Sequence, residues 1–446
     1  MTDVAAVDLL VSGGPLLTMD SQGSFFLDGA VAIDGGRIVT VGSAKAVTSS
    51  VSARAMLHAS GKAILPGFVN CHGHTGLILL RGLAEEFPLQ PWLVNTVWPV
   101  MRFAGPEETY IAARLACLEM IRSGITTFTD MWRDLPAVEN AVEESGLRAR
   151  LAFNMRDYSD PALLEPEWRA GLEAIETPVR TPFIKHGLAP HSLYACSNEI
   201  LRRCAQEVEK IGCHLQIHIA ETQLEVSESL QKHGCTPVER LDELGLLGPH
   251  TLLAHGVWMN ETDCARAARA RATVSHNVTS NMKLASGIAP LARFRSAGLN
   301  LALGTDSAAS NNVLDPFREM KFALLAQRAS TGDVATLTPR MALEAATRNG
   351  ARALGMADEI GSLEPGKQAD MILIDLDKPH FAPSRPNDAD ALMASIVFCA
   401  CASDVDTVIV GGRIIMRNRE VSTLEAQLVR ESAGAASQRL LSRANR

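Results

Sequence analysis

The middle of the chain alternates short apolar runs, each ending in polar residues, with longer helix-like stretches. Eight such runs, each followed by helical sequence, predict eight β-then-α units between about residues 66 and 365. The candidate strands are FVNCHGH, GITTFTDM, ARLAFNMRD, IKHGLAPHS, CHLQIHIAE, HTLLAHGV, ATVSHNV and NLALGTDS. This order predicts a (β/α)8 barrel of the TIM type, a fold whose active sites lie at the carboxyl ends of the strands.

The two ends of the chain follow another pattern. Apolar strands punctuated by glycine-rich turns occur in GAVAIDGGRIVTVGS near the beginning and in VDTVIVGGRIIMRN near the end. The same four residues, Gly-Gly-Arg-Ile, occur at both ends. We therefore expect an α/β protein with two domains. Residues 66–365 would form the barrel, and residues 1–65 together with 366–446 would form a small β-sandwich domain.

Composition excludes several classes of function. A net charge of −8 and a pI near 5.9 argue against nucleic acid or an anionic membrane as the main partner. No apolar run reaches the roughly 18 residues of a spanning helix, and the N-terminus lacks the basic region of a signal peptide. Nine cysteines without a CxxC pair indicate reduced thiols. These features predict a cytoplasmic protein.

Ionisable side chains stand at the ends of several predicted strands. His72 and His74 form an HxH pair, whose side chains would project to the same side of a strand. His218 ends the apolar run LQIHI, where a charge would be costly unless a metal satisfied it. Asp306 follows LALGT. Imidazoles and a carboxylate at strand ends far apart in sequence predict convergence on one metal ion.

Further polar residues follow the same strands. Glu221, three residues past His218, could take a proton from water and return it to a leaving group, or it could simply face a helix N-terminus. His255, after TLLA, could be a metal ligand or an electrophile, and both alternatives stay open here. His276 would orient its neighbours without touching the ion.

The donor set predicts one divalent metal ion. A bound metal lowers the pKa of water from 15.7 to about 7, which serves hydrolytic attack on an electrophilic carbon. Three histidines and a carboxylate suit zinc. Four protein ligands exceed the usual three of catalytic zinc sites, so iron(II) and manganese(II) stay open.

Taken together, these motifs resemble the amidohydrolase superfamily, in the branch of S-adenosylhomocysteine/methylthioadenosine deaminases and s-triazine chlorohydrolases. The motifs are PGFVNCHGH, LLRGLAEEFPLQPWL, SGITTFTDM, GLAPHSLYACS, HIAET, LLAHG, SHNVTSNMKLASGIAPL, GTDSAASNN and IGSLEPGKQADMILIDL.

The resemblance implies roles for the residues just described. The ligands of a single metal would be His72, His74, His218 and Asp306. Asp306 would also steady the attacking hydroxide, Glu221 would be the proton shuttle, and His255 would polarise the substrate. The resemblance further implies a homodimer or higher homo-oligomer.

The resemblance also implies a substrate pocket that contains Trp92 and His191. Two residues depart from the pattern of the branch. Met101 stands where the nucleoside deaminases carry an acid that holds the ribose hydroxyls, and a methionine accepts hydrogen bonds only weakly. Ser307 follows the metal aspartate where the branch often has glycine, and it could alter the leaving-group pocket.

We therefore predict an aminohydrolase that acts on C–N bonds of a small amino-substituted N-heterocycle of the purine, pterin or triazine type. The alternatives are dechlorination of an s-triazine-like ring and hydrolysis of an amide or carbamate. Met101 places S-adenosylhomocysteine/methylthioadenosine deamination lower. A catalytically silent scaffold ranks last, because every ligand position is filled.

Overall fold

The structure is a computed structural model that describes residues 5–83, 85–385 and 387–445. Eight parallel strands form a near-closed barrel in sequence order, as predicted. The hydrogen bond from Cys71 N to Leu303 O (2.9 Å) links the segments that follow the first and end the last strand. The barrel strands are β6 (Phe68–Asn70), β7 (Ile125–Trp132), β8 (Arg148–Met155), β9 (Ile184–Pro190), β10 (His214–Ile219), β11 (Thr251–His255), β12 (Thr273–His276) and β13 (Asn300–Leu303).

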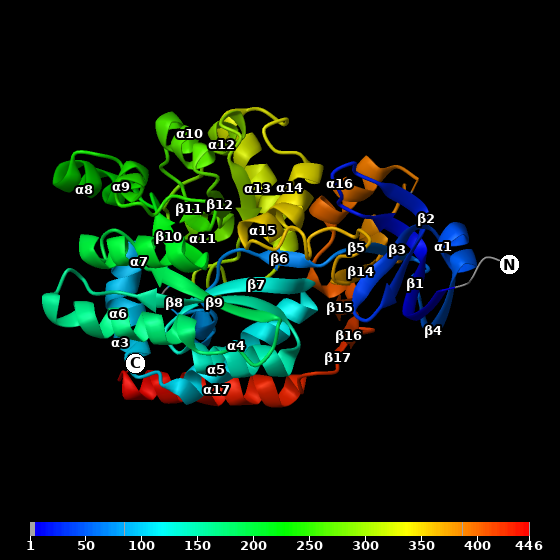
Figure 1. Cartoon of the computed structure of the whole chain (residues 1–446), viewed down its shortest axis with the longest axis horizontal. Helices are drawn as coiled ribbons and strands as arrows, with labels where there is room; N and C mark the ends of the chain where they lie inside the picture. Colours follow the sequence, from blue (N-terminus) through cyan, green and yellow to red (C-terminus); the bar gives the residue numbers. More distant parts are fainter. Residues whose placement is uncertain (1–4, 84, 386, 446) are drawn as a thin grey trace.

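Both ends of the chain contribute to a second, mixed sheet, as the glycine-punctuated pattern predicted. The two ends meet where β5 pairs antiparallel with β14. In Figure 1 this sheet lies to the right of the barrel. Its strands are β1 (Ala5–Leu17), β2 (Phe25–Asp34), β3 (Arg37–Ser43), β4 (Val51–His58), β5 (Lys62–Pro66), β14 (Met371–Asp375), β15 (Val405–Val410), β16 (Arg413–Arg417) and β17 (Glu420–Val421).

The helices around the barrel carry clear start and stop signals. The helix α7 begins after Ser197, whose side chain accepts from Ile200 N, and ends at Gly212 in the left-handed region (φ 67°). The barrel helices are α4 (Pro106–Arg122), α5 (Leu135–Ser145), α6 (Pro161–Glu176), α7 (Asn198–Ile211), α8 (Gln223–His233), α9 (Pro237–Glu243), α10 (Glu261–Arg269), α11 (Val278–Lys283), α12 (Leu291–Ser296), α13 (Pro316–Thr331), α14 (Pro339–Ala345) and α15 (Arg348–Ala353).

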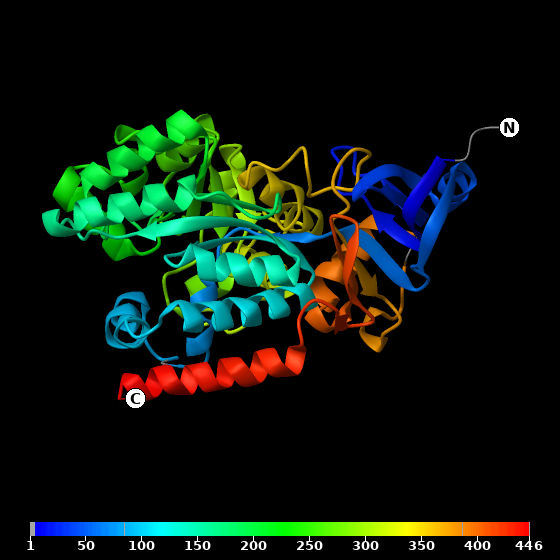
Figure 2. The same cartoon turned by 60° about the horizontal axis from the view of Figure 1, so that its bottom comes forward.

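Five further α-helices of the described residues lie outside this set. They are α1 (Ala44–Ser50), α2 (Leu89–Trp92), α3 (Trp98–Met101), α16 (Ala389–Cys399) and α17 (Ala426–Arg443). The C-terminal helix α17 runs from the terminal sheet along the outside of the barrel (Figure 2). It packs on α4, and the Ser437 hydroxyl donates to Leu79 O at 2.7 Å. Among the described residues, no helix is both long and apolar enough to cross a membrane.

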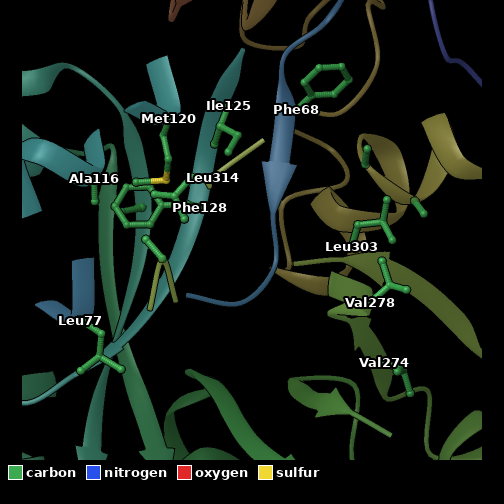
Figure 3. Close-up of a cluster of buried hydrophobic side chains, with 14 of the residues drawn as sticks. Phe68, Leu77, Ala116, Met120, Ile125, Phe128, Val274, Val278, Leu303 and Leu314 are labelled. Carbon is green, nitrogen blue, oxygen red and sulfur yellow. The ribbon is translucent and has the colours of Figure 1, made fainter. Parts of the chain in front are cut away.

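An apolar core joins the barrel strands to their helices. Phe128 of β7 and Met120 of α4 lie in the same cluster as Phe68 of β6 (Figure 3), and all three are fully or almost fully buried. The Phe68 ring meets Phe317 of α13 edge to face, with ring centroids 5.1 Å apart. This packing holds the amino-terminal part of the barrel rigid below the polar strand ends.

A buried ion pair connects the barrel to the terminal sheet. Arg148, the first residue of β8, donates from Nε and Nη2 to the two carboxylate oxygens of Asp370, both at 3.0 Å. Each side chain is only 2% exposed. Gly411 N, in the turn between β15 and β16, donates to the same carboxylate at 2.7 Å. Removing Asp370 would therefore leave a buried guanidinium without its counter-charge.

We expect Asp370→Ala to lower the free energy of unfolding by about 3–5 kcal/mol, the cost of breaking a buried pair. Urea unfolding measures this change. The control is Asp390→Ala, because Asp390 pairs with Arg340 at the surface and is 80% exposed. That control is expected to cost less than about 1 kcal/mol. An equal effect of the two substitutions would contradict the prediction.

Candidate active site

A cleft opens at the carboxyl ends of the barrel strands, where the fold predicts an active site. It brings together almost all of the site residues expected from the sequence. His72 does not line the cleft, because it is completely buried at its base. The predicted residues that line it are His74, Trp92, Met101, His191, His218, Glu221, His255, Asp306 and Ser307.

The HxH histidines lie past the first barrel strand. β6 ends at Asn70, and residues 71–74 have no regular secondary structure. The prediction that strand alternation aligns the two side chains is therefore wrong. The loop conformation does so instead, with the imidazole centroids of His72 and His74 4.8 Å apart. The backbone of this loop is tied to the end of the barrel by Asp306 N, which donates to His72 O at 3.0 Å.

Backbone carbonyls orient two of the histidines. The Nδ1 of His74 lies 3.1 Å from Met131 O, and the Nδ1 of His218 lies 2.7 Å from His191 O. A carbonyl oxygen only accepts hydrogen bonds, so each Nδ1 carries the proton. Each Nε2 is then an unprotonated lone pair that faces the cleft. Carbonyl partners on the outer nitrogen are a common support for metal-ligating histidines.

His72 is oriented in the same way, but by a side chain and not by a backbone carbonyl. Its Nδ1 lies 3.4 Å from the Gln216 carbonyl oxygen, and its Nε2 has no hydrogen-bond partner among the described residues. Burial, followed by the neighbouring imidazoles, lowers the pKa of His72 to about 3, although the Asp306 charge opposes this. The ring is therefore neutral at physiological pH. An unpartnered buried nitrogen calls for a ligand.

The donor atoms fit a metal ion. The Nε2 atoms of His74 and His218 are only 3.2 Å apart, with no proton to place between them. Two ligands of a tetrahedral zinc at 2.0–2.1 Å would be about 3.3 Å apart. An Asp306 carboxylate oxygen lies 3.5 Å from His74 Nε2 and 3.7 Å from His72 Nε2. Lone pairs facing each other at this distance repel unless a cation lies between them.

Asp306 is held as an anion. One carboxylate oxygen accepts from Ser280 Oγ at 2.6 Å, and the other accepts from Ser307 N at 2.7 Å. Burial favours the neutral acid, whereas the hydrogen bonds from Ser280 and Ser307 favour the charged form. Its position as the fourth donor is therefore supported by both charge and hydrogen bonding.

Three strand ends adopt the left-handed backbone conformation that favours glycine. Ala220 has φ 47°, His255 has φ 76°, and Asp306 has φ 58°. Such residues cost about 1–3 kcal/mol each and persist where the surrounding structure over-determines them. Two of the three are predicted site residues, and the third precedes Glu221. These strained backbone conformations therefore direct the side chains of the site residues into the cleft.

Glu221 and His255 face each other across the cleft. Glu221 Oε2 lies 3.8 Å from His255 Nε2. Burial, with the Asp306 charge as a second cause, raises the pKa of Glu221 well above its ordinary value. The other ring nitrogen of His255 lies 2.7 Å from the Asn281 carbonyl oxygen, so it carries the proton and Nε2 faces the cleft. A buried carboxyl with a raised pKa, in a cleft beside an imidazole nitrogen, suits proton transfer.

Comparison with known proteins agrees with this geometry. The model of the amidohydrolase family matches residues 63–415, which is more than half of the chain. The chain belongs to the amidohydrolase family. The family that the motifs indicated is thereby confirmed.

Two characterised relatives span nearly the whole chain. The 5'-deoxyadenosine deaminase of Methanothermobacter thermautotrophicus is 41% identical over 92% of this chain and 95% of that enzyme. The 5-methylthioadenosine/S-adenosylhomocysteine deaminase of Pelotomaculum thermopropionicum is 38% identical over 98% of this chain and 99% of that enzyme. A crystal structure of a Xanthomonas campestris adenosine deaminase with bound zinc superposes with a TM-score of 0.92 at 29% identity, covering 98% and 99% of the two chains.

In this amidohydrolase the donor atoms form a metal-binding site. Two groups of ligand atoms, each within 4.8 Å of one another, share His72. One adds His74 and Asp306, and the other adds His218 and His255. The sequence left open whether His255 is a ligand or an electrophile. Its proximity to both His72 and Glu221 fits either role.

The walls of the amidohydrolase cleft differ in polarity. The segment of residues 89–101 supplies an apolar wall that includes Trp92, Trp98 and Met101. The cleft is also lined by the polar side chains of Asn154, Arg156 and Tyr194. Among the described lining residues, the acids are only Glu221 and Asp306, both at the base of the cleft. The sequence predicted Trp92 and Met101 in the pocket but not Arg156.

Several supporting residues of this amidohydrolase were missed. Asp130 accepts from Thr75 N (2.8 Å) and Thr75 Oγ1 (2.7 Å) and so holds the loop after the HxH pair. Asn281 orients His255, whereas the sequence predicted that His276 would orient its neighbours. Both ring nitrogens of His276 lack a hydrogen-bond partner among the described residues, so that interpretation is not supported. The only sequence feature that indicates the role of Asn281 is its place in the motif SHNVTSNMKLASG.

Proposed function

We propose that this amidohydrolase is a metal-dependent deaminase of adenine nucleosides altered at the 5' position. The observation that carries the proposal is the convergence of unprotonated imidazole nitrogens and one carboxylate beside the buried carboxyl of Glu221. Both relatives described above are deaminases whose names give a 5'-altered adenosine as substrate.

We assign the metal ligands to His72, His74, His218 and Asp306. The ion would supply Lewis acidity that brings the pKa of water close to 7. Zinc is the proposed metal, supported by the three histidine donors and by the zinc in the related adenosine deaminase structure. Iron(II) and manganese(II) are the alternatives that a metal analysis would separate from it.

The protein side chains would manage protons and orientation. Water adds to C6 of the adenine ring, and a C–O bond forms as the ring nitrogen gains a proton. Glu221 would accept the proton from water and deliver it to the ring nitrogen. It would then carry the proton of the new hydroxyl to the amino group, so that the C=O bond forms as the C–N bond breaks and ammonia leaves. His255 and Asp306 would hold the attacking oxygen in line. Burial of all three side chains keeps bulk water out of these transfers.

Substrate specificity would depend on the walls of the cleft. Trp92, Met101, His191 and Ser307 remain the proposed substrate-binding residues, and all four line the cleft. Met101 by itself favours flatter heterocycles over nucleosides as substrates. The two deaminase relatives support the opposite order, so we now place adenine nucleosides first and triazine dechlorination or amide hydrolysis behind. A homo-oligomer and a cytoplasmic location stay predictions.

The experiment is a panel of ammonia-release assays with zinc-loaded protein. We expect release from 5'-deoxyadenosine, 5'-methylthioadenosine and S-adenosylhomocysteine. Aminotriazines, guanine and pterins should give at least about 100-fold lower kcat/KM, a difference of about 2.7 kcal/mol in transition-state binding. Adenosine in the same panel tests whether a 5'-hydroxyl is accepted. Turnover of only the non-nucleoside compounds would overturn the proposal.

A further inference from the structure

The sequence pattern Thr-x-x-Glu begins two consecutive helices. Thr222 and Glu225 begin α8, directly after the strand that carries His218, and Thr236 and Glu239 begin α9. In such a pattern the threonine caps the helix and the glutamate usually bonds back to the threonine amide, which is called a capping box. The two helices therefore offer an internal comparison of the same motif.

The helix α9 forms the ordinary capping box. The Thr236 hydroxyl accepts from Glu239 N at 3.2 Å, and a Glu239 carboxylate oxygen accepts from Thr236 N at 3.0 Å. The Glu239 side chain stays 30% exposed. In α9 the motif therefore caps the helix while the Glu239 carboxylate stays in contact with solvent.

The helix α8 departs from this arrangement. The Thr222 hydroxyl still accepts from Glu225 N, at 3.2 Å, but the Glu225 carboxylate does not accept from the Thr222 amide. One oxygen accepts from Ala220 N at 3.1 Å, and the other accepts from Glu221 N at 2.9 Å. The carboxylate therefore bridges two consecutive amides of the turn between β10 and α8. Successive amides of a turn form such an anion-binding concavity.

This arrangement is costly for an acid. Glu225 is 5% exposed, and burial raises its pKa to about 7 despite the two backbone hydrogen bonds. Nothing in helix capping requires this burial, because Glu239 caps α9 while it stays in contact with water. The buried position instead serves the turn, where Ala220 has the unfavourable φ of 47°.

The turn matters because it places Glu221. Apart from the 3.8 Å approach to His255, the Glu221 carboxyl makes no hydrogen bond or ion pair with the described residues. Its position in the cleft therefore depends on its own backbone. That backbone is fixed on one side by Trp258 N, which donates to Ala220 O at 2.8 Å, and on the other side by Glu225.

We propose that Glu225 is a positioning residue that sets the place of the Glu221 carboxyl through its bridge to the amides of Ala220 and Glu221. The inference rests on the proposed function, in which Glu221 moves the proton. It does not concern the metal, because Glu225 contacts none of the proposed ligands. A displacement of about 1 Å in a reacting group can cost on the order of 10²-fold in rate.

The test begins with Glu225→Gln, which leaves one acceptor oxygen for two amides. We expect kcat on 5'-deoxyadenosine to fall about 10- to 100-fold, with KM changed less than about 3-fold and metal content per chain as in the wild type. The matched control is Glu228→Gln. Glu228 lies on the exposed face of the same helix, and we expect wild-type kinetics from it.

A double-mutant cycle separates positioning from a merely structural role. If Glu225 acts through Glu221, adding Glu225→Gln to a Glu221→Gln protein should lower kcat less than about 2-fold further. A general structural defect would instead multiply with the loss from Glu221→Gln. Multiplying effects, or wild-type kcat in Glu225→Gln, would overturn the inference. Loss of metal from Glu225→Gln would overturn it as well, because it would place the effect at the ligands.

Failure of the proposed function and failure of this inference give different results. Wild-type protein that deaminates no adenine nucleoside would remove the proposed function, whereas an active wild type with an unaffected Glu225→Gln variant would remove only this inference. If Glu225→Gln gives no folded protein, Glu225→Asp takes its place in the cycle. Aspartate keeps the charge but is one methylene too short to span both amides, so the same non-additive loss is expected.

Discussion

His72→Ala is expected to lose its metal ion and to reduce ammonia release to the uncatalysed background. His72 is completely buried, and its Nε2 has no other partner among the described residues. Without the ion, water returns from a pKa of about 7 to 15.7, a change on the order of 12 kcal/mol in deprotonation free energy. No side chain of the cleft can supply an effect of that size. Metal analysis of the purified variant and an ammonia assay measure the two losses.

The control for this prediction is His58→Ala. His58 is exposed in β4 of the terminal sheet, so that variant should keep its metal and its activity. Chelation of the wild type should abolish activity, and added zinc should restore it, whereas added zinc should not rescue His72→Ala. Full activity in metal-free wild-type protein would show that the reaction does not use the ion.

Glu221→Gln is expected to lower kcat by about 10²- to 10⁴-fold, the usual contribution of a positioned acid–base group. The amide has the same shape but cannot take up the proton. The four proposed ligands do not include Glu221, so the metal content should be unchanged. Measured kcat, KM and metal content per chain together distinguish this result from that of His72→Ala.

The matched control is Glu239→Gln, because Glu239 is the acid of the second Thr-x-x-Glu motif and does not line the cleft. It should leave kcat unchanged while it weakens the start of α9 by about 1 kcal/mol. A Glu221→Gln variant that turns over within about 3-fold of the wild type would contradict the role of Glu221 as proton shuttle.

Much of the fold followed from patterning alone. Buried parallel strands are almost wholly apolar, and each ends where the chain meets solvent, so a polar residue after an apolar run marks a strand end. His218 after LQI and His255 after TLLA are correctly placed for this reason. The proposed domain limits at residues 65 and 365 stay predictions, although the pairing of β5 with β14 joins both chain ends as expected.

Other features could not be read from spacing. The HxH pair lies in a loop beyond β6, where side-chain direction depends on backbone angles that no periodicity encodes. The proton positions on His74 and His218 depend on the carbonyl of Met131 in β7 and on that of His191, directly after β9. Contacts between distant segments of this kind form only when the barrel closes.

The sequence by itself determined the barrel, the terminal sheet and the identity of the ionisable groups at the strand ends. Periodicity and residue chemistry are local properties, and a strand end is a local event. The tertiary structure alone decided which nitrogen of each histidine faces the cleft and that Asn281 orients His255. It also decided that two identical Thr-x-x-Glu motifs differ in use, because only Glu225 lies beside a strained turn that needs a buried acceptor.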